Sequence, residues 1–286
     1  MEMAVDLIKL KKFVELALEE DVRDGDHTSL STIDADAQGE ANLLVKDQGI
    51  LAGVEVAEAI FHFIDPDLSL EIYLKDGAYV HSGDVAFRVK GSIQSILKAE
   101  RLVLNVMQRM SGIATRVVDY SERLEGTPAK VLDTRKTTPL LRFLEKEAVR
   151  IGGGANHRFG LYDMILIKDN HVDYAGGISN ALKKAHAYRL EKNLDIPIEI
   201  EVRNFEELEE VLANEKVERV MFDNFSPEEV RKAVKLVGGR LVTEASGGIT
   251  LETIRDYALS GVDFISVGAL THSVKSLDLS LKAKII

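Results

Sequence analysis

The spacing of hydrophobic and polar positions along the chain changes after residue 124. Before that point the apolar spacing predicts an amphipathic helix at 1–20, a second helix at 54–63 and a long one at 92–124. Segment 41–53 has the apolar content of a strand. Segment 68–92 alternates apolar and polar residues between Gly and Asp turns, which is typical of antiparallel strands. The first third is therefore predicted to be an α+β domain.

From residue 125 onward, short apolar runs rich in β-branched residues alternate with helical segments. Two helix starts are well marked, by Asn204 with Glu207 three residues later and by Ser226-Pro227-Glu228-Glu229. Strand–helix alternation with apolar strands predicts a parallel sheet covered on both faces. Six such units favour a closed or nearly closed α/β barrel, with a doubly wound open sheet as the alternative. The six runs are KVLDTR, MILIKDN, IPIEIEV, RVMFDN, RLVTEAS and DFISVG.

Composition narrows the class of protein. A chain of 286 residues fits one or two domains of roughly 100–200 residues. The absence of cysteine excludes disulfides, iron–sulfur clusters and thiolate metal sites, and it fits a reducing, cytoplasmic location. Charged residues such as Asp6 and Lys9 interrupt the apolar start, so no signal peptide is expected, and no apolar run is long enough for a membrane span. The net charge of −11 argues against binding nucleic acid.

One segment departs from this acidic balance. Between Asp133 and His171 there are seven lysines and arginines against five acidic residues, so the segment is locally basic. Such a segment in an acidic protein suggests a small anionic ligand. For Arg142, Lys146 and Arg150, which follow helical spacing, a solvated helix face is an equally good interpretation.

Five of the apolar runs carry polar or charged residues at or near their ends. In α/β barrels the carboxyl ends of the strands form the active-site face, so these side chains are expected to converge. The alternative, solvated loop starts, does not explain charges placed within a run, such as Glu201 followed by Val202. The residues are Asp133, Arg135 and Lys136; Lys168, Asp169, Asn170 and His171; Glu199 and Glu201; Asp223 and Asn224; and Glu244, Ser246, Gly247 and Gly248.

Two glycine-bearing turns are candidate phosphate sites. Ser246-Gly247-Gly248 follows a strand and precedes a helix that we expect to be capped by Thr250, and Gly268 follows the next strand. Backbone N–H groups at such turns can approach an anion. Gly152-Gly153-Gly154 follows a helical stretch and is interpreted as a flexible loop that positions Asn156, His157 and Arg158.

The acidic residues at the strand ends suit a divalent cation. Glu201 and Asp223, on successive strands, offer hard oxygen ligands of the kind that Mg²⁺ shares with substrate phosphates. The histidines lack the spacing of a zinc site.

At this point the chain resembles a known family, quinolinate phosphoribosyltransferase, also called carboxylating nicotinate-nucleotide pyrophosphorylase. The motifs extend in order over nearly the whole chain, and the NHR and LIKDNH blocks are the most specific. They are EEDVRDGDHTS, ERLVLNVMQRMSGIAT, DTRKTTP at 133–139, GGGANHRFGLYDMILIKDNH at 152–171, EIEV at 199–202, FDN at 222–224, EASGGI at 244–249 and SVGALTHS at 266–273.

The resemblance implies an N-terminal open-faced α/β sandwich over 1–112, joined by 275–286, and a C-terminal α/β barrel over 113–274. It implies transfer of phosphoribosyl from phosphoribosyl pyrophosphate to quinolinate with decarboxylation, which gives nicotinate mononucleotide for NAD biosynthesis. Mg²⁺ is the implied cofactor, held by Glu201 and Asp223 through water and substrate. The implied assembly is a homodimer with sites shared across the interface, and a trimer of dimers is a further assembly that the family allows.

The resemblance also assigns roles to individual residues. Lys136, Glu201 and Asp223 are the implied catalytic residues, with Lys136 between the two substrates and the carboxylates serving ribose and metal. Arg101 would reach the site of the neighbouring subunit. The remaining residues would bind the substrates: Arg135, His157, Arg158 and Lys168 the quinolinate carboxylates, and Ser246, Gly247, Gly248 and Gly268 phosphate.

Two positions depart from the family pattern, and two other functions remain open. Leu140 stands where the family usually has Gly, and Glu147 where an aromatic residue is common, which puts the local loop geometry in doubt. Nicotinate is an alternative acceptor, although four basic groups together favour the dicarboxylate. The segment 75–91 is similar to turns of biotinyl or lipoyl carriers, but it has no modifiable lysine at a hairpin tip.

Overall fold

The computed structural model describes residues 5–214 and 217–284, and the chain divides into two compact units. Unit 1 contains residues 5–118, 137–153 and 271–284, and unit 2 contains the described residues of 119–136 and 154–270. The boundary expected near residue 112 and the change of unit after residue 118 both fall inside one helix, Ile93–Glu122, and the expected boundary stays a prediction. The division assigns the segment 137–153 to unit 1 rather than to unit 2.

Unit 1 is built on an antiparallel sheet with strand order β12-β1-β5-β3, beside a small β2–β4 pair. Two helices span the division between the units, α4 (Ile93–Glu122) and α11 (Ala269–His272). The other elements of unit 1 are α1 (Leu7–Asp21), α2 (His27–Thr32), β1 (Gln38–Val45), β2 (Gly49–Ile50), α3 (Val54–Ile64), β3 (Ser69–Ile72), β4 (Tyr79–Val80), β5 (Val85–Ser92), α5 (Arg142–Ile151) and β12 (Leu279–Lys284).

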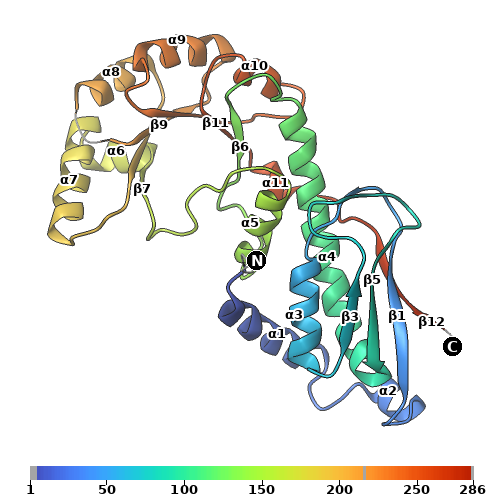
Figure 1. The fold of residues 1–286 in the computed structure, drawn as a ribbon. Coiled ribbons are helices and arrows are strands. Elements are labelled where there is room, and N and C mark those ends of the chain that lie inside the picture. The colour runs from blue at the N-terminus through green and yellow to red at the C-terminus, as the bar shows by residue number, and fades with distance from the viewer. Residues whose placement is uncertain (1–4, 215–216, 285–286) are drawn as a thin grey trace. The chain divides into compact units, whose positions relative to one another are not determined.

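The sheet of unit 1 is covered on one face. Along β1 buried residues such as Leu43 alternate with half-exposed ones such as Asn42, as expected for a strand with one face in the core. Helix α3 packs on the buried face, where the rings of Phe61 and Phe87 meet edge to face with centroids 6.1 Å apart. Figure 1 shows α1 and α3 on the same side of this sheet. The arrangement is an open-faced sandwich.

The two ends of the chain contribute to this unit. Helix α1 begins at Leu7, where the Asp6 carboxylate accepts hydrogen bonds from the backbone N–H groups of Ile8 and Lys9. Strand β12 pairs antiparallel with β1, from Glu40 opposite Lys284 to Val45 opposite Leu279. The predicted helix at 1–20 and the predicted returning segment 275–286 also include residues 1–4 and 285–286, which lie outside the described part of the chain.

Unit 2 contains a six-stranded parallel sheet with strand order β6-β11-β10-β9-β8-β7. Figure 1 shows α8 and α9 following their strands on the outside of this sheet. The elements are β6 (Lys130–Leu132), β7 (Ile165–Ile167), α6 (Asp169–Ala175), α7 (Ile178–Glu191), β8 (Ile198–Val202), α8 (Phe205–Ala213), β9 (Arg219–Asp223), α9 (Pro227–Val237), β10 (Val242–Ser246), α10 (Ile254–Ala258) and β11 (Phe264–Ser266).

The winding of this sheet decides between the two predicted architectures. Each strand from β7 to β11 lies beside the next one in sequence, and β6, the first, pairs with β11, the last. A doubly wound sheet reverses direction at an interior strand, and this one does not. Among the described residues no pairing joins β6 to β7, and Ala155 forms a single parallel bridge with Leu132 at the β6 edge. The predicted α/β class with a nearly closed barrel is confirmed.

Local signals placed the starts of α8 and α9 correctly. The side chain of Asn204 accepts from the Glu207 N–H at the start of α8. At the start of α9, Ser226 and Glu229 form a reciprocal capping box with Pro227 in the first turn. No helix in the described residues is long and apolar enough to cross a membrane.

The segment 137–153 carries both departures from the family pattern. Leu140 is 80% exposed and has φ +66°, the left-handed conformation that glycine adopts without strain and that costs other residues about 1–2 kcal/mol. Glu147 forms an ion pair with Arg150, 2.5 Å away on the same helix. Gly152 is close-packed rather than flexible, because a Cβ there would lie 2.6 Å from the carbonyl oxygen of Ala114.

A buried ion pair holds this segment to α4. The fully buried Glu145 accepts from Arg109 Nη2 at 2.9 Å and from the Thr138 N–H at 3.2 Å. We expect Glu145→Ala to lower the free energy of unfolding by about 3–5 kcal/mol, because it leaves the Arg109 charge without its partner. Urea unfolding followed by circular dichroism measures this. Glu19→Ala, an exposed position on α1, is the control, and equal stability of the two variants would contradict the prediction.

Candidate active site

One face of the parallel sheet carries ionisable side chains although its strands are buried. On β8, Glu199 and Glu201 alternate with apolar residues, and both are buried. Successive side chains on a strand point to opposite faces, so both glutamates share one face. The register aligns Glu201 with Met221 of β9 and Met221 with Glu244 of β10, which places Glu244 on that face as well.

Lys168 joins this face from the end of β7. Its Nζ donates to Glu201 Oε2 at 3.0 Å, with the lysine side chain 48% exposed and the glutamate side chain 7% exposed. The backbone N–H of Lys168 donates to His171 Nδ1 at 2.9 Å, so His171 caps the following helix α6. The structure therefore brings the predicted residues Lys168 and Glu201 into direct contact.

The ends of β9 and β10 bring Asp223 beside the glycine turn. Asp223 is aligned with Ser246, and the Asn224 N–H donates to the Ser246 carbonyl oxygen at 2.9 Å. Gly247 and Gly248 have φ +105° and +60°, and a Cβ on Gly247 would lie 2.2 Å from Asn224 Oδ1, so only glycine fits there.

The helix expected directly after this turn is displaced. The prediction that Thr250 caps it is wrong, because α10 begins at Ile254 and the Thr250 N–H donates to the Thr253 hydroxyl at 3.0 Å. The left-handed glycines extend the turn before the chain becomes helical. Gly268 immediately precedes α11, which has only four residues. Turn N–H groups, more than a helix dipole, are thus what both segments offer to a phosphate.

The segment after the triple glycine carries the guanidinium group of Arg158, and Arg135 follows β6. The Asp133 carboxylate accepts from the His157 N–H at 2.8 Å, and Arg158 Nη1 donates to the Met164 carbonyl oxygen at 3.2 Å. Burial lowers the pKa of the half-buried Arg158, and the positive charge of Arg135 lowers it further. The charge of Arg135 thus disfavours the charged form of Arg158, and a bound anion would act in the opposite direction.

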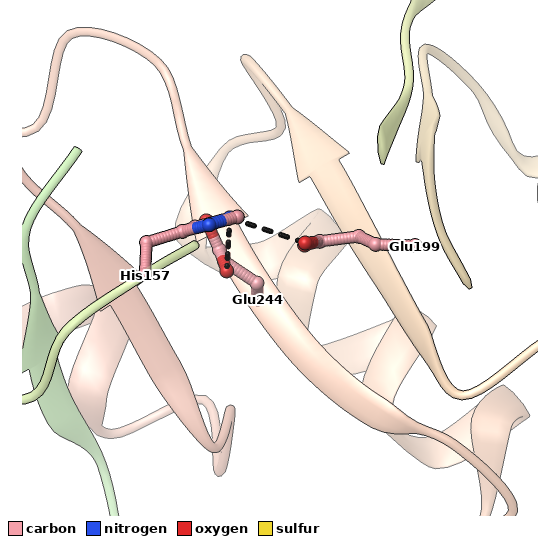
Figure 2. Close-up of side chains that lie close together, drawn as sticks. All are labelled: His157, Glu199 and Glu244. Atoms are coloured by element: carbon pink, nitrogen blue, oxygen red, sulfur yellow. Dashed lines mark ion pairs between the residues drawn. The ribbon is translucent and has the colours of Figure 1, made fainter. Parts of the chain in front are cut away.

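A second group of ionisable side chains lies buried on the same face (Figure 2). His157 Nε2 is 3.1 Å from Glu199 Oε2 and 3.6 Å from Glu244 Oε2, and both carboxyl groups have no exposed surface. Burial raises the pKa of each carboxyl group, and the charge of Glu199 raises the pKa of Glu244 further. The charge of Arg219, whose Nη1 lies 3.2 Å from Glu244 Oε2, acts in the opposite direction on both.

The sequence placed Glu199 and Glu244 among the side chains expected to converge but gave them no individual role, and it did not single out Arg219. The available signal was a charged residue inside a buried strand, which is rare unless the charge is paired. The sequence does not indicate the partner, because His157 and Arg219 come from segments distant along the chain.

Two further predicted residues are exposed. Lys136 is exposed, and its backbone N–H donates to the Thr134 hydroxyl at 3.0 Å. Arg101 is an exposed residue of α4 in unit 1, and its participation stays a prediction.

Two family models match the chain almost from end to end. The model of the N-terminal domain of quinolinate phosphoribosyl transferase matches residues 26–111, and that of the C-terminal domain matches residues 113–282. The chain belongs to the quinolinate phosphoribosyltransferase family. The predicted family and enzyme class are thereby confirmed.

Relatives and solved structures agree with this membership. The chain is 49% identical over 288 residues to the chloroplastic nicotinate-nucleotide pyrophosphorylase (carboxylating) of Arabidopsis thaliana, covering 96% of this chain and 82% of the relative. It is 46% identical, with the same coverage, to the mitochondrial quinolinate phosphoribosyltransferase (decarboxylating) 2b of Nicotiana tabacum. The structure of the nicotinate-nucleotide pyrophosphorylase from Francisella tularensis superposes with a TM-score of 0.91 at 37% identity, covering 99% of this chain and all of the other.

Proposed function

We propose that the chain transfers phosphoribosyl from phosphoribosyl pyrophosphate to quinolinate with loss of CO2, giving nicotinate mononucleotide and pyrophosphate in NAD biosynthesis. The observation that carries the proposal for this site is the Arg135–Arg158 pair on the same unit as the Lys168–Glu201 ion pair and the glycine turn at 246–248. The cations of such a site can bind the carboxylates of quinolinate. Its turn N–H groups can bind the phosphate of phosphoribosyl pyrophosphate, and its carboxylates can serve the ribose and the metal.

Quinolinate binding falls to the basic side chains. Planar guanidinium groups bind carboxylates through two parallel hydrogen bonds, each contributing roughly 1.5–3 kcal/mol. The charge of Arg135 lowers the pKa of Arg158, so a dicarboxylate bound by both would favour the charged form of Arg158. The half-exposed Lys168, which pairs with Glu201, adds a third cation for the carboxylates of quinolinate.

The chemistry requires two bond exchanges. The ring nitrogen of quinolinate forms a bond to the anomeric carbon as the bond from that carbon to pyrophosphate oxygen breaks. Positive charge develops on the ribose, and the Glu201 carboxylate, held by Lys168, stabilises it electrostatically. The quaternised nitrogen then accepts electron density as the adjacent carboxyl group leaves as CO2, and a proton from solvent or a side chain replaces it. Lys136, between the substrates, favours departure of the pyrophosphate.

The carboxylates at the strand ends fit a magnesium ion. Glu201 and Asp223 lie at the carboxyl ends of neighbouring strands, and two carboxylates completed by water and substrate phosphate are a common Mg²⁺ arrangement. Asp223 Oδ2 accepts from Asn224 Nδ2 at 2.7 Å, which orients its carboxylate. The ion would supply charge neutralisation on the leaving pyrophosphate.

Assembly and location belong to the same proposal. A homodimer in which Arg101 reaches the neighbouring site, with a trimer of dimers as its larger form, would add a further cation for quinolinate. A cytoplasmic location also stays a proposal, because the Arabidopsis and Nicotiana relatives are named chloroplastic and mitochondrial. Light scattering and a fluorescent fusion test these points separately.

The direct test supplies the protein with phosphoribosyl pyrophosphate, Mg²⁺ and either quinolinate or nicotinate. We expect mononucleotide and CO2 in equal amounts from quinolinate, little product from nicotinate and loss of turnover on chelation of the metal. Chromatography of the mononucleotide and capture of labelled CO2 measure this. Product from nicotinate alone would replace the proposal with the monocarboxylate alternative.

A further inference from the structure

The buried group beneath the candidate site has a hydrogen-bonding pattern of its own (Figure 2). The Arg158 N–H donates to His157 Nδ1 at 2.6 Å, so Nδ1 is an acceptor. In a neutral imidazole one nitrogen donates and the other accepts, and in an imidazolium both donate. An accepting Nδ1 therefore leaves Nε2 carrying the hydrogen, and Nε2 faces Glu199 at 3.1 Å.

The hydrogen on Nε2 argues against a metal ion in the cluster of His157, Glu199 and Glu244. A metal ion among His157, Glu199 and Glu244 would need the lone pair of Nε2, which the hydrogen occupies. It would also sit beside Arg219, 3.2 Å from Glu244 Oε2. A hydrogen on Nε2 instead faces the Glu199 carboxylate at ion-pair distance, which is an ordinary arrangement for a buried imidazole beside a carboxylate.

We propose that Glu199, supported by Glu244, is a positioning residue that holds His157 and thereby sets Arg158 for quinolinate. The inference rests on the proposed function, and it changes the role of His157 from direct carboxylate ligand to anchor. Both ring nitrogens face protein groups, and the His157 and Arg158 backbone N–H groups are held by Asp133 and by the ring. One fully buried carboxyl group thus lies against the side chain that accepts from the backbone N–H of Arg158.

The charges around Glu199 support a role for this residue in quinolinate binding rather than in the stability of the fold. Cations act on Glu199 from three other segments: Arg158 in the loop, Lys168 after β7 and Arg219 on β9. Two of them are predicted quinolinate ligands. Loss of the Glu199 carboxyl group would therefore change the positions of Arg158 and Lys168. The backbone contacts of the glycine turn at 246–248 would stay the same.

The test compares Glu199→Leu and Glu199→Gln by steady-state kinetics with each substrate varied. Leucine removes the acceptor, so we expect KM for quinolinate to rise about tenfold to a hundredfold, with KM for phosphoribosyl pyrophosphate unchanged. Glutamine keeps an oxygen for Nε2 and an N–H for Glu244, so it should restore wild-type values. Glu209→Leu, exposed on α8, is the control. Glu199→Leu removes one partner of a buried ionic group, so a lower thermal midpoint is expected as well, and the split between the two KM values is the readout that separates positioning from stability.

A double-mutant cycle with His157→Ala completes the test. If Glu199 acts through His157, the double variant is no worse than the poorer single variant. Effects that multiply, or equal rises in both KM values, would each overturn the proposal. Metal that copurifies with the wild type and is absent from Glu199→Leu would also overturn it. Wild-type protein that does not convert quinolinate would refute the proposed function instead. Active wild type with a normal Glu199→Leu variant would refute the positioning role alone.

Discussion

Arg158→Ala is expected to lower kcat/KM for quinolinate by about 10²–10⁴-fold, mainly through a higher KM. The estimate assumes loss of two charge-assisted hydrogen bonds of about 1.5–3 kcal/mol each. Burial and the charge of Arg135 both lower the pKa of Arg158, so an anionic ligand would favour its charged form. Steady-state rates at fixed phosphoribosyl pyrophosphate and varied quinolinate measure the effect.

Two variants make this result specific. Arg158→Lys keeps the charge but lacks the planar fork, so it should recover only part of the lost affinity. Arg231→Ala removes an exposed arginine on α9 and should behave as the wild type. Circular dichroism should be the same for all three. Near-normal turnover by Arg158→Ala would remove Arg158 from the binding site.

Glu201→Gln is expected to reduce kcat by about 10²–10³-fold while KM for quinolinate changes less. The glutamine has nearly the same shape but no charge, so it gives less stabilisation to a cationic ribose, and an interaction of this kind contributes to the transition state more than to the ground state. The variant also leaves Lys168 Nζ with a neutral acceptor in place of a carboxylate.

The position of Glu201 makes a second measurement useful. If the ion pair matters mainly for orienting Lys168, Lys168→Met and Glu201→Gln should have equal and non-additive effects. If Glu201 acts on the ribose, Glu201→Gln should be the more severe in kcat and Lys168→Met the more severe in KM for quinolinate. Glu209→Gln, exposed on α8, serves as the control. An unchanged kcat for Glu201→Gln would contradict a role in the chemical step.

Much of the fold was predictable because its signals are local. Ser226 and Glu229 lie three residues apart, so the sequence alone places the start of α9. The apolar runs mark the parallel strands because each strand buries side chains on both faces. Thr250 shows the limit of such signals. Threonine is a common capping residue, but Thr250 lies in a turn that follows two left-handed glycines, and the helix begins only after Thr253.

The candidate site was likewise predictable only in part. Lys168, Glu201 and Asp223 were found because a charge at the end of an apolar run stands out in one sequence. Their chemistry could be predicted from residue type, and parallel strands with aligned registers bring their ends to one edge. Leu140 was recognised as a departure, but its positive φ is visible only in the backbone.

The sequence by itself thus determined the class of fold, the number of strand–helix units and which side chains could hold two anions. The tertiary structure alone decided that β6 pairs with β11, so that the sheet winds in one direction, and that His157 lies over Glu199 and Glu244. The physical reason is the range of the interactions. Periodicity, capping and turn chemistry act within a few residues, whereas strand pairing and the burial of a charge depend on partners that come from distant segments and are brought together only by packing.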